Sequence, residues 1–226
     1  MTHPTNIQAV LFDRDDTLSL NDREAWGRAA RWLRERYGLD SREAARQMQA
    51  QWAGVEGQWQ HLRTLADEED FWRDYGAQLA GRLGLPEGEG ARIVQAWPYQ
   101  RFLMPAPGVR EVLTQLRARG LKIGVLSNTL PNVAVTLEAV ELADVVDVAI
   151  STCALGVHKP EPRAFTLAAK LLEVAPEEVL FVDDRPENVA AARGVGMGAL
   201  LIDHAGQLPE AIHHLTGVLD HLGGLP

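Results

Sequence analysis

The 226-residue sequence contains one cysteine and no long apolar segment. Cys153 has no second thiol to pair with, which excludes an internal disulfide and favours a reducing compartment. No apolar run approaches the roughly 20 residues that cross a bilayer. The polar residues 1–6 lack the charged and apolar regions of a signal peptide. We therefore expect a cytoplasmic protein with no membrane partner.

Positive charge is scarce along the chain. Lys and Arg together number 22 against 31 Asp and Glu, which gives a net charge of -9. Because phosphate backbones are bound by clustered Lys and Arg, we expect no nucleic-acid partner. The hydrophobic content of 46% is ordinary for a soluble globular protein.

Lysine and the large aromatic residues are unevenly distributed. All six Trp and all three Tyr fall within residues 19–104, whereas every Lys falls outside that segment. The chain shows no internal repeat and no low-complexity tract. The two compositions predict two structural units, one built from residues 1–18 and 105–226 and the other from residues 19–104.

Short apolar runs alternate with helical patterns outside residues 19–104. The first run, residues 7–12, is too short for a solitary helix and reads as a strand buried on both faces. Further strands are expected over residues 121–126, 145–150, 179–182 and 199–202. Helices are expected over residues 109–119, 131–142, 186–193 and 208–222, with another marked by Phe165, Ala168 and Leu172. This alternation predicts an α/β fold with a Rossmann-like parallel sheet and right-handed crossovers.

Residues 19–104 show helical stripes and no convincing strand. Asn21 is the expected N-cap of a first helix, with Glu24 as its capping-box partner and Gly38 as its end. Three more helices are expected, from residue 41, over about residues 67–83, and around residues 93–97. We expect a small helical bundle inserted after the first strand, with its aromatic stripes in the core. Trp59 fits no stripe and is expected to be more exposed.

The first strand ends in the sequence Asp13-Arg14-Asp15-Asp16-Thr17. It delivers three carboxylates to the carboxyl edge of the sheet, where open α/β sheets bind their ligands. Burying an unpaired charge costs several kcal/mol, so a cation is expected there, and oxygen ligands of this kind suit Mg²⁺. Taken alone, this motif also fits a polar loop that caps the following helix.

Three further polar motifs follow the later strands. Ser127 and Asn128 come directly after one strand, and Lys159 lies in the segment Gly-Val-His-Lys-Pro after the next. Asp183 and Asp184 follow a third strand. A nucleophile, an acid/base, a phosphate-binding hydroxyl, a cation and metal carboxylates are the groups that phosphoryl transfer requires.

In order and spacing, these four motifs resemble those of the haloacid dehalogenase-like superfamily, specifically its Mg²⁺-dependent phosphatases. The insertion lies where that superfamily carries its helical C1 cap domain. The resemblance implies that Asp13 is the nucleophile, forming an aspartyl-phosphate, and that Asp15 is the general acid and base. Ser127 and Lys159 would hold the transferring phosphoryl oxygens.

The resemblance also implies a bound Mg²⁺. Its ligands would be Asp13, the backbone carbonyl of Asp15, and Asp184, with Asp183 either helping or orienting a bound water. Thr17 would tie its hydroxyl to the motif. The implied substrate-binding residues are Thr17, Ser127, Asn128 and Lys159.

Two positions depart from the superfamily's pattern. Asp16 stands where many members have glycine, and we expect it to cap the loop locally. The fourth motif, Asp-Asp-Arg-Pro-Glu-Asn, lacks the later aspartate of the Gly-Asp-x-x-x-Asp form. Indirect metal contacts are therefore left open among Asp183, Glu187 and Asn188. His158 is expected to belong to a plain surface loop.

Four alternative functions are compatible with this fold. Dehalogenases carry no aspartate at the position of Asp15 and need no metal, and phosphonate hydrolases need a cap lysine that residues 19–104 do not contain. A phosphomutase stays open, although Thr17 is more typical of phosphatases, and so does a non-catalytic Mg²⁺-binding module. We expect a Mg²⁺-dependent phosphomonoester hydrolase that acts on a small phosphorylated metabolite. The identity of that metabolite and the oligomeric state are left open.

Overall fold

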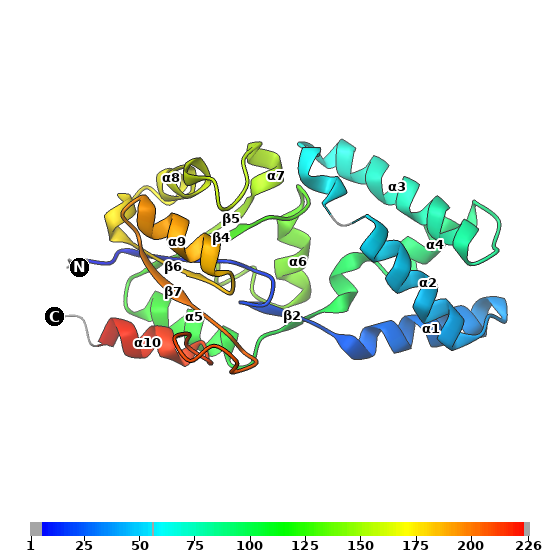
Figure 1. Ribbon diagram of the computed structural model, residues 1–226, viewed down its shortest axis with the longest axis horizontal. Helices are drawn as coiled ribbons and strands as arrows, with labels where there is room; N and C mark the ends of the chain where they lie inside the picture. Colours follow the sequence, from blue (N-terminus) through cyan, green and yellow to red (C-terminus); the bar gives the residue numbers. More distant parts are fainter. Residues whose placement is uncertain (1–5, 56, 224–226) are drawn as a thin grey trace.

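A five-stranded parallel sheet with the strand order β5–β4–β1–β6–β7 forms the centre of the fold (Figure 1). The computed structural model describes residues 6–55 and 57–223. The strands are β1 (Ala9–Phe12), β4 (Lys122–Ser127), β5 (Val148–Ser151), β6 (Val179–Asp183) and β7 (Gly198–Leu201). Strand β1 pairs with β4 on one side and β6 on the other, and all of its residues are fully buried.

Alternate residues of β1 pack against helices on opposite faces of the sheet, as strand geometry requires. Val10 and Phe12 share an apolar cluster with α5 (Val109–Ala118), α6 (Val133–Ala139) and α10 (Thr216–Gly223). Ala9 and Leu11 share a second cluster with α8 (Pro162–Leu171) and α9 (Pro186–Gly194). The short helix α7 (Thr152–Leu155) comes directly after β5. The 3-10 helix η3 (Pro176–Glu178) comes directly before β6. The predicted Rossmann-like α/β fold is confirmed.

A helical insertion lies beside the sheet, between β2 and β3 (Figure 1). Its own apolar cluster includes Ala25, Leu33, Met48 and Leu79 and is distinct from the two clusters of the sheet. No helix within residues 6–55 and 57–223 combines the length and apolarity needed to cross a membrane. The elements of the insertion are α1 (Arg23–Tyr37), α2 (Ser41–Gly54), η1 (Gln58–His61), α3 (Leu65–Arg82), α4 (Glu89–Ala96) and η2 (Tyr99–Phe102).

Two short antiparallel strands, β2 (Ser19–Asn21) and β3 (Leu103–Pro105), connect the insertion to the sheet. The sequence did not predict them, because each has three residues and pairs only with the other. The predicted boundaries at residues 18/19 and 104/105 fall at β2 and β3, which join the helical insertion to the sheet. The division into two domains stays a prediction. Residues 1–5 and 224–226 of the predicted outer segments lie outside the described part of the chain.

The first helix begins one residue later than predicted. Asp22, not Asn21, is the N-cap, and its carboxylate accepts hydrogen bonds from the backbone N–H groups of Glu24 and Ala25. Asn21 belongs to β2, and its side chain accepts a hydrogen bond from the indole of Trp26. Aspartate and asparagine are both favourable N-cap residues. Asp22 is the N-cap here because Asn21 pairs with β3 and is therefore part of a strand.

The C-terminal helix is shorter than predicted, starting at Thr216 in place of residue 208. The preceding residues form a loop in which Ile212 bridges to Ile202 beside the sheet. The carboxylate of Asp203 accepts backbone hydrogen bonds from Gln207 and Leu208, so these N–H groups are held in the loop. The helix predicted over residues 131–142 spans Val133–Ala139, and the strand predicted over 145–150 spans Val148–Ser151.

The Trp and Tyr residues of the insertion are half-buried. Several of them pack against its apolar cluster, as expected, namely Trp26, Trp32, Tyr37, Tyr75 and Trp97. Trp52 stacks on the rings of Trp59 and Tyr99, with centroid distances of 5.5 and 5.1 Å. Trp59 is therefore packed in this cluster and is less exposed than its position between stripes suggested. Much of this aromatic surface faces a cavity, which is described below.

Helices α3 and α4 approach so closely that their backbones touch at Gly76 and Gly90. A Cβ placed on Gly90 would lie 2.2 Å from the backbone oxygen of Gly76, which no real contact permits. We therefore expect Gly90→Ala to lower the free energy of unfolding by about 1–3 kcal/mol, the usual cost of overpacking. Thermal melts followed by circular dichroism would measure this loss.

Gly81→Ala is the matched control for this prediction. Gly81 lies on α3, and nothing lies within 4 Å of a Cβ placed on it. Alanine favours a helix over glycine by about 0.8–1.0 kcal/mol, so this variant should melt at the same temperature or higher. Equal melting temperatures for Gly90→Ala and the wild type would contradict the close-approach argument.

Candidate functional site

Asp13 lies at the carboxyl end of the central strand. Its backbone N–H donates to the carbonyl of Val182 on β6 over 2.8 Å, which continues the sheet ladder one residue beyond β1. Its side chain is buried, with 6% of the residue exposed. The strand register thus aims this carboxylate at the edge where β4 and β6 also end.

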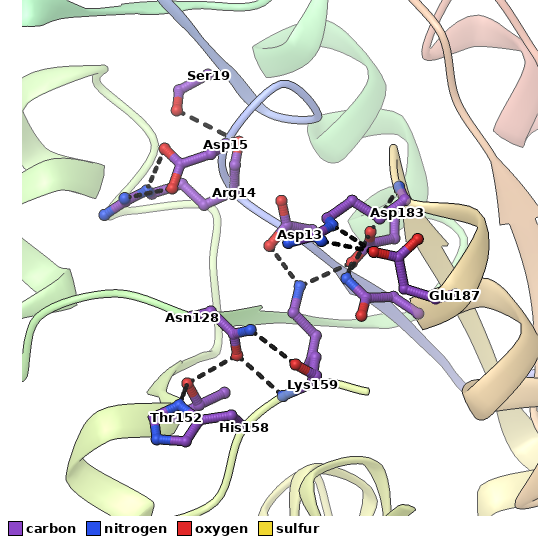
Figure 2. A network of polar contacts seen from close by, with 12 residues as sticks. Asp13, Arg14, Asp15, Ser19, Asn128, Thr152, His158, Lys159, Asp183 and Glu187 are labelled. Atoms are coloured by element: carbon purple, nitrogen blue, oxygen red, sulfur yellow. Dashed lines mark hydrogen bonds and ion pairs between the residues drawn. The ribbon is translucent and has the colours of Figure 1, made fainter. Parts of the chain in front are cut away.

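The ammonium group of Lys159 joins Asp13 to Asp183 (Figure 2). The Nζ atom lies 2.5 Å from Oδ1 of Asp13 and 2.7 Å from Oδ2 of Asp183, and all three side chains are buried. Burial raises the pKa of Asp13, and Asp183 and Asp15 add to the rise, while Lys159 opposes it. Burial alone would lower the pKa of Lys159, but the two carboxylates outweigh it, so that the lysine stays charged.

Asp183 is fixed by three further hydrogen bonds. The side-chain amide of Asn188 donates to both of its carboxylate oxygens, over 2.9 and 3.1 Å, and the backbone N–H of Arg185 donates to Oδ1. Glu187 instead pairs with the side chain of Arg185. Of the residues left open above, Asn188 therefore contacts the site directly, and Asp183 serves to orient Lys159. The predicted contact of Asp183 with a metal stays a prediction.

Asn128 holds the backbone of Lys159 (Figure 2). Its side-chain amide donates to the carbonyl of Lys159, and its Oδ1 accepts the Lys159 N–H, each over 2.9 Å. The hydroxyl of Thr152 donates to the same Oδ1. The predicted contact of Asn128 with the substrate stays a prediction.

Two buried hydroxyl groups at the site have no hydrogen-bond partner among the described residues. These are the hydroxyls of Thr17 and Ser127. An orphaned buried polar group costs about 1–3 kcal/mol. Ser127 ends β4, two residues beyond Val125, which pairs with Phe12 next to Asp13. Its hydroxyl is thus available to a ligand at the sheet edge.

Asp15 is turned away from this cluster and toward Arg14 (Figure 2). The guanidinium of Arg14 contacts both carboxylate oxygens of Asp15, at 3.1 and 2.6 Å, and is itself 1% exposed. It also donates to the hydroxyls of Thr136 and Tyr99. Sequence reasoning assigned Arg14 no role, because its partners Tyr99 and Thr136 lie far along the chain.

Asp16 adopts a left-handed backbone with φ of 52°. Aspartate is among the few residues other than glycine that tolerate this conformation. This explains why it stands where many superfamily members have glycine. Its carboxylate and that of Asp15 both border the cavity under the helical insertion.

Further hydrogen bonds join the insertion to the sheet unit. His158 lies in a partly exposed loop, as expected, and its ring contacts both Thr152 and the backbone carbonyl of Gln60 in η1. Cys153 is buried, and burial raises the pKa of its thiol to about 11. Other bonds across this interface run from Arg63 to the carbonyl of Cys153 and from the backbone of Asn132 to Glu68.

The predicted metal ligands are carboxylate and carbonyl oxygens, which are the donors that suit a divalent cation such as Mg²⁺. Among the residues that the structure describes, no three carboxylate, imidazole or thiol groups are arranged as a metal site. Burial raises the pKa of Asp184 to about 6, and repulsion from Asp183 and Asp16 contributes. One lysine thus faces several mutually repelling carboxylates. Hard oxygen donors with surplus negative charge are what Mg²⁺ requires.

The chain is similar to proteins of known family. The haloacid dehalogenase-like hydrolase family matches residues 7–196. The phosphatase MT3486 of Mycobacterium tuberculosis (strain CDC 1551 / Oshkosh) is 34% identical over 227 residues, covering 96% of this chain and 99% of that protein. The (S)-2-haloacid dehalogenase of Xanthobacter autotrophicus is 32% identical over 173 residues, covering 74% of this chain and 67% of that protein.

Solved structures agree with the sequence matches. The crystal structure of a HAD phosphatase from Thermococcus onnurineus superposes with a TM-score of 0.67 and 25% identity, covering 96% of this chain and 99% of that chain. The predicted family resemblance is thereby confirmed. The chain belongs to the haloacid dehalogenase-like hydrolases.

Proposed function

We propose that the protein is a Mg²⁺-dependent phosphomonoester hydrolase that acts through an aspartyl-phosphate on Asp13. The observation that carries this proposal is the buried Asp13–Lys159 pair at the same sheet edge as the hydroxyl of Ser127, which has no hydrogen-bond partner among the described residues. A carboxylate nucleophile, a fixed positive charge and a free hydroxyl donor are suited to a tetrahedral anion. The similarity to the phosphatase MT3486 supports the same reaction class.

Two steps account for hydrolysis with these residues. A carboxylate oxygen of Asp13 attacks phosphorus while the bond to the leaving oxygen breaks, and Asp15 gives that oxygen its proton. Asp15 then takes a proton from water, whose oxygen attacks phosphorus and releases inorganic phosphate and the Asp13 carboxylate. Bound Mg²⁺, held by Asp13, Asp184 and the carbonyl of Asp15, would offset charge on the phosphoryl oxygens.

The other residues act on the phosphoryl group or on one another. Lys159 supplies a point charge to the phosphoryl oxygens, and Ser127 donates a hydrogen bond to one of them. Asp183 and Asn128 hold Lys159 in place by its side chain and its backbone. The helical insertion would act as a cap that excludes water during transfer. Within the cytoplasm, the substrate would be a small phosphorylated metabolite.

The presence of Asp15 favours a phosphatase over a dehalogenase, despite the similarity to the dehalogenase of Xanthobacter autotrophicus. Halide displacement yields an anion that needs no proton, whereas an alkoxide leaving group does. Asp15 is partly exposed and lines the cavity, where it would supply that proton after release from its ion pair with Arg14.

Phosphate release from a panel of phosphomonoesters tests the mechanism. We expect wild-type activity with Mg²⁺, loss of activity with a chelator, and recovery on adding Mg²⁺. Asp13→Asn removes the nucleophile and should abolish release. Asp15→Asn removes the proton donor and should lower kcat by about 10²- to 10⁴-fold.

Release that persists both in Asp13→Asn and in chelator would overturn this mechanism. Metal-independent release of chloride from 2-chloropropionate would identify a dehalogenase instead. Interconversion of sugar phosphates without net phosphate release would identify a mutase. Mg²⁺ binding by a folded protein without turnover of any of these compounds would identify a binding module.

Asn128 should act on kcat through the position of Lys159. Because Asn128→Ala removes both hydrogen bonds to the Lys159 backbone, we expect kcat to fall by about tenfold to hundredfold, as for displacements near 1 Å. Asn128→Asp keeps the acceptor for the Lys159 N–H and should recover part of the loss. Steady-state kinetics with circular dichroism as a folding control would measure both, and unchanged kcat in Asn128→Ala would contradict the positioning role.

A further inference from the structure

A cavity of about 170 Å³ lies between the helical insertion and the loop that carries Asp15 and Asp16. We propose that it binds the leaving group of the substrate, and that this group is uncharged, apolar and about the size of one aromatic ring. The inference rests on the proposed phosphatase function and names its substrate class.

The cavity begins at the proposed acid. Asp15 and Asp16 form part of its wall, and the remaining wall comes from α1–α4, η2 and the strands β2 and β3. Since Asp15 protonates the leaving oxygen, that oxygen must lie at this wall during transfer. The group attached to that oxygen then occupies the cavity.

The lining is dominated by aromatic and aliphatic side chains. Trp52 is nearly parallel to two other lining rings, at 18° to Tyr99 and 9° to Trp72, and the three rings form an offset-stacked group. Apolar surface buried on such rings gains roughly 25 cal/mol per Å². Trp97 also lines the cavity, and its buried indole N–H has no hydrogen-bond partner among the described residues. Further apolar lining residues are Trp26, Met48, Leu79, Ile93 and Phe102.

Anionic leaving groups do not fit this lining. Of the described residues that line the cavity, the charged ones are Asp15 and Asp16, and none is cationic. Arg14 is close, but its guanidinium is committed to Asp15, Thr136 and Tyr99. A carboxylate or a second phosphate on the leaving group would lie beside these two acids with no cationic side chain to pair with it, at a cost of several kcal/mol.

The two acids would attract a cationic leaving group, but such a group would compete with cations that the protein already places on the rings. Two of the rings that could hold a cation already have a guanidinium over them, with Arg14 5.5 Å from the centroid of Tyr99 and Arg101 5.6 Å from that of Trp97. These aromatic faces are therefore engaged by positive charge within the protein. An uncharged group avoids both problems.

The volume limits the size of the group. An apolar cavity of about 150 Å³ made by mutation in another protein binds benzene. The cavity here is similar, at about 170 Å³. One ring or a short branched alkyl group fits it, whereas a nucleoside, with both a base and a sugar, does not.

A comparison of four phosphomonoesters tests this inference with wild-type protein and Mg²⁺. Benzyl phosphate carries the proposed kind of leaving group, and glycerol 1-phosphate, phosphoglycolate and phosphocholine carry polar, anionic and cationic alkyl groups. We expect kcat/KM for benzyl phosphate to exceed each of the others by at least about tenfold, as apolar pockets discriminate. A higher kcat/KM for phosphoglycolate or phosphocholine would overturn the inference and leave the phosphatase function standing.

A pair of matched substitutions assigns the preference to the cavity. Trp52→Leu removes one ring of the offset-stacked group, and the ratio of kcat/KM for benzyl phosphate to that for glycerol 1-phosphate should fall by about tenfold. Trp32→Leu makes the same change on α1, where Trp32 packs against Tyr37 and does not line the cavity. This control should keep the wild-type ratio. Equal ratios in the two variants would overturn the inference.

Binding of benzyl alcohol separates this inference from the proposed function. Calorimetric titration should show saturable binding to the wild type and Trp32→Leu, and about tenfold weaker binding to Trp52→Leu. If none of the four esters releases phosphate while this binding pattern holds, the phosphatase function fails and the apolar site stands. If phosphate is released but benzyl alcohol does not bind, the cavity assignment fails and the function stands.

Discussion

One buried ammonium group holds together three separate parts of the chain. The Nζ atom of Lys159 contacts Asp13 from the end of β1 and Asp183 from the end of β6, while Asn128, after β4, fixes the backbone of the lysine. Removing one partner of a buried ion pair commonly costs about 3–5 kcal/mol, because the other charge is left unpaired. The sheet edge is therefore organised around this charge, and the surrounding strands serve to deliver its partners.

The sheet explains why these partners meet. Parallel strands end at a common edge, and β1 lies between β4 and β6 in the strand order. Each strand is short and buried, so its apolar residues fix the register, and the first polar residue after it is placed with little freedom. Alternate residues of β1 belong to opposite apolar clusters, so both faces of the strand are buried.

Much of this arrangement could be predicted from the sequence because its signals are local. An apolar run followed by carboxylates marks β1 and Asp13, and the same pattern marks β6 and Asp183. The fork between Arg14 and Asp15 could not be predicted, because it depends on Tyr99 and Thr136 from distant elements. The cavity was missed for a related reason: a stripe of aromatic residues has the same spacing whether it faces a core or a hollow.

The pairing of β2 with β3 has a consequence for how such a protein can change during evolution. Ser19 lies opposite Pro105, so the chain leaves the sheet unit and returns to it at the same place. The intervening segment can lengthen, shorten or exchange its helices while the distance between β1 and α5 stays constant. Selection can therefore remodel the walls of the cavity without disturbing the carboxylates and the lysine that carry out the chemistry.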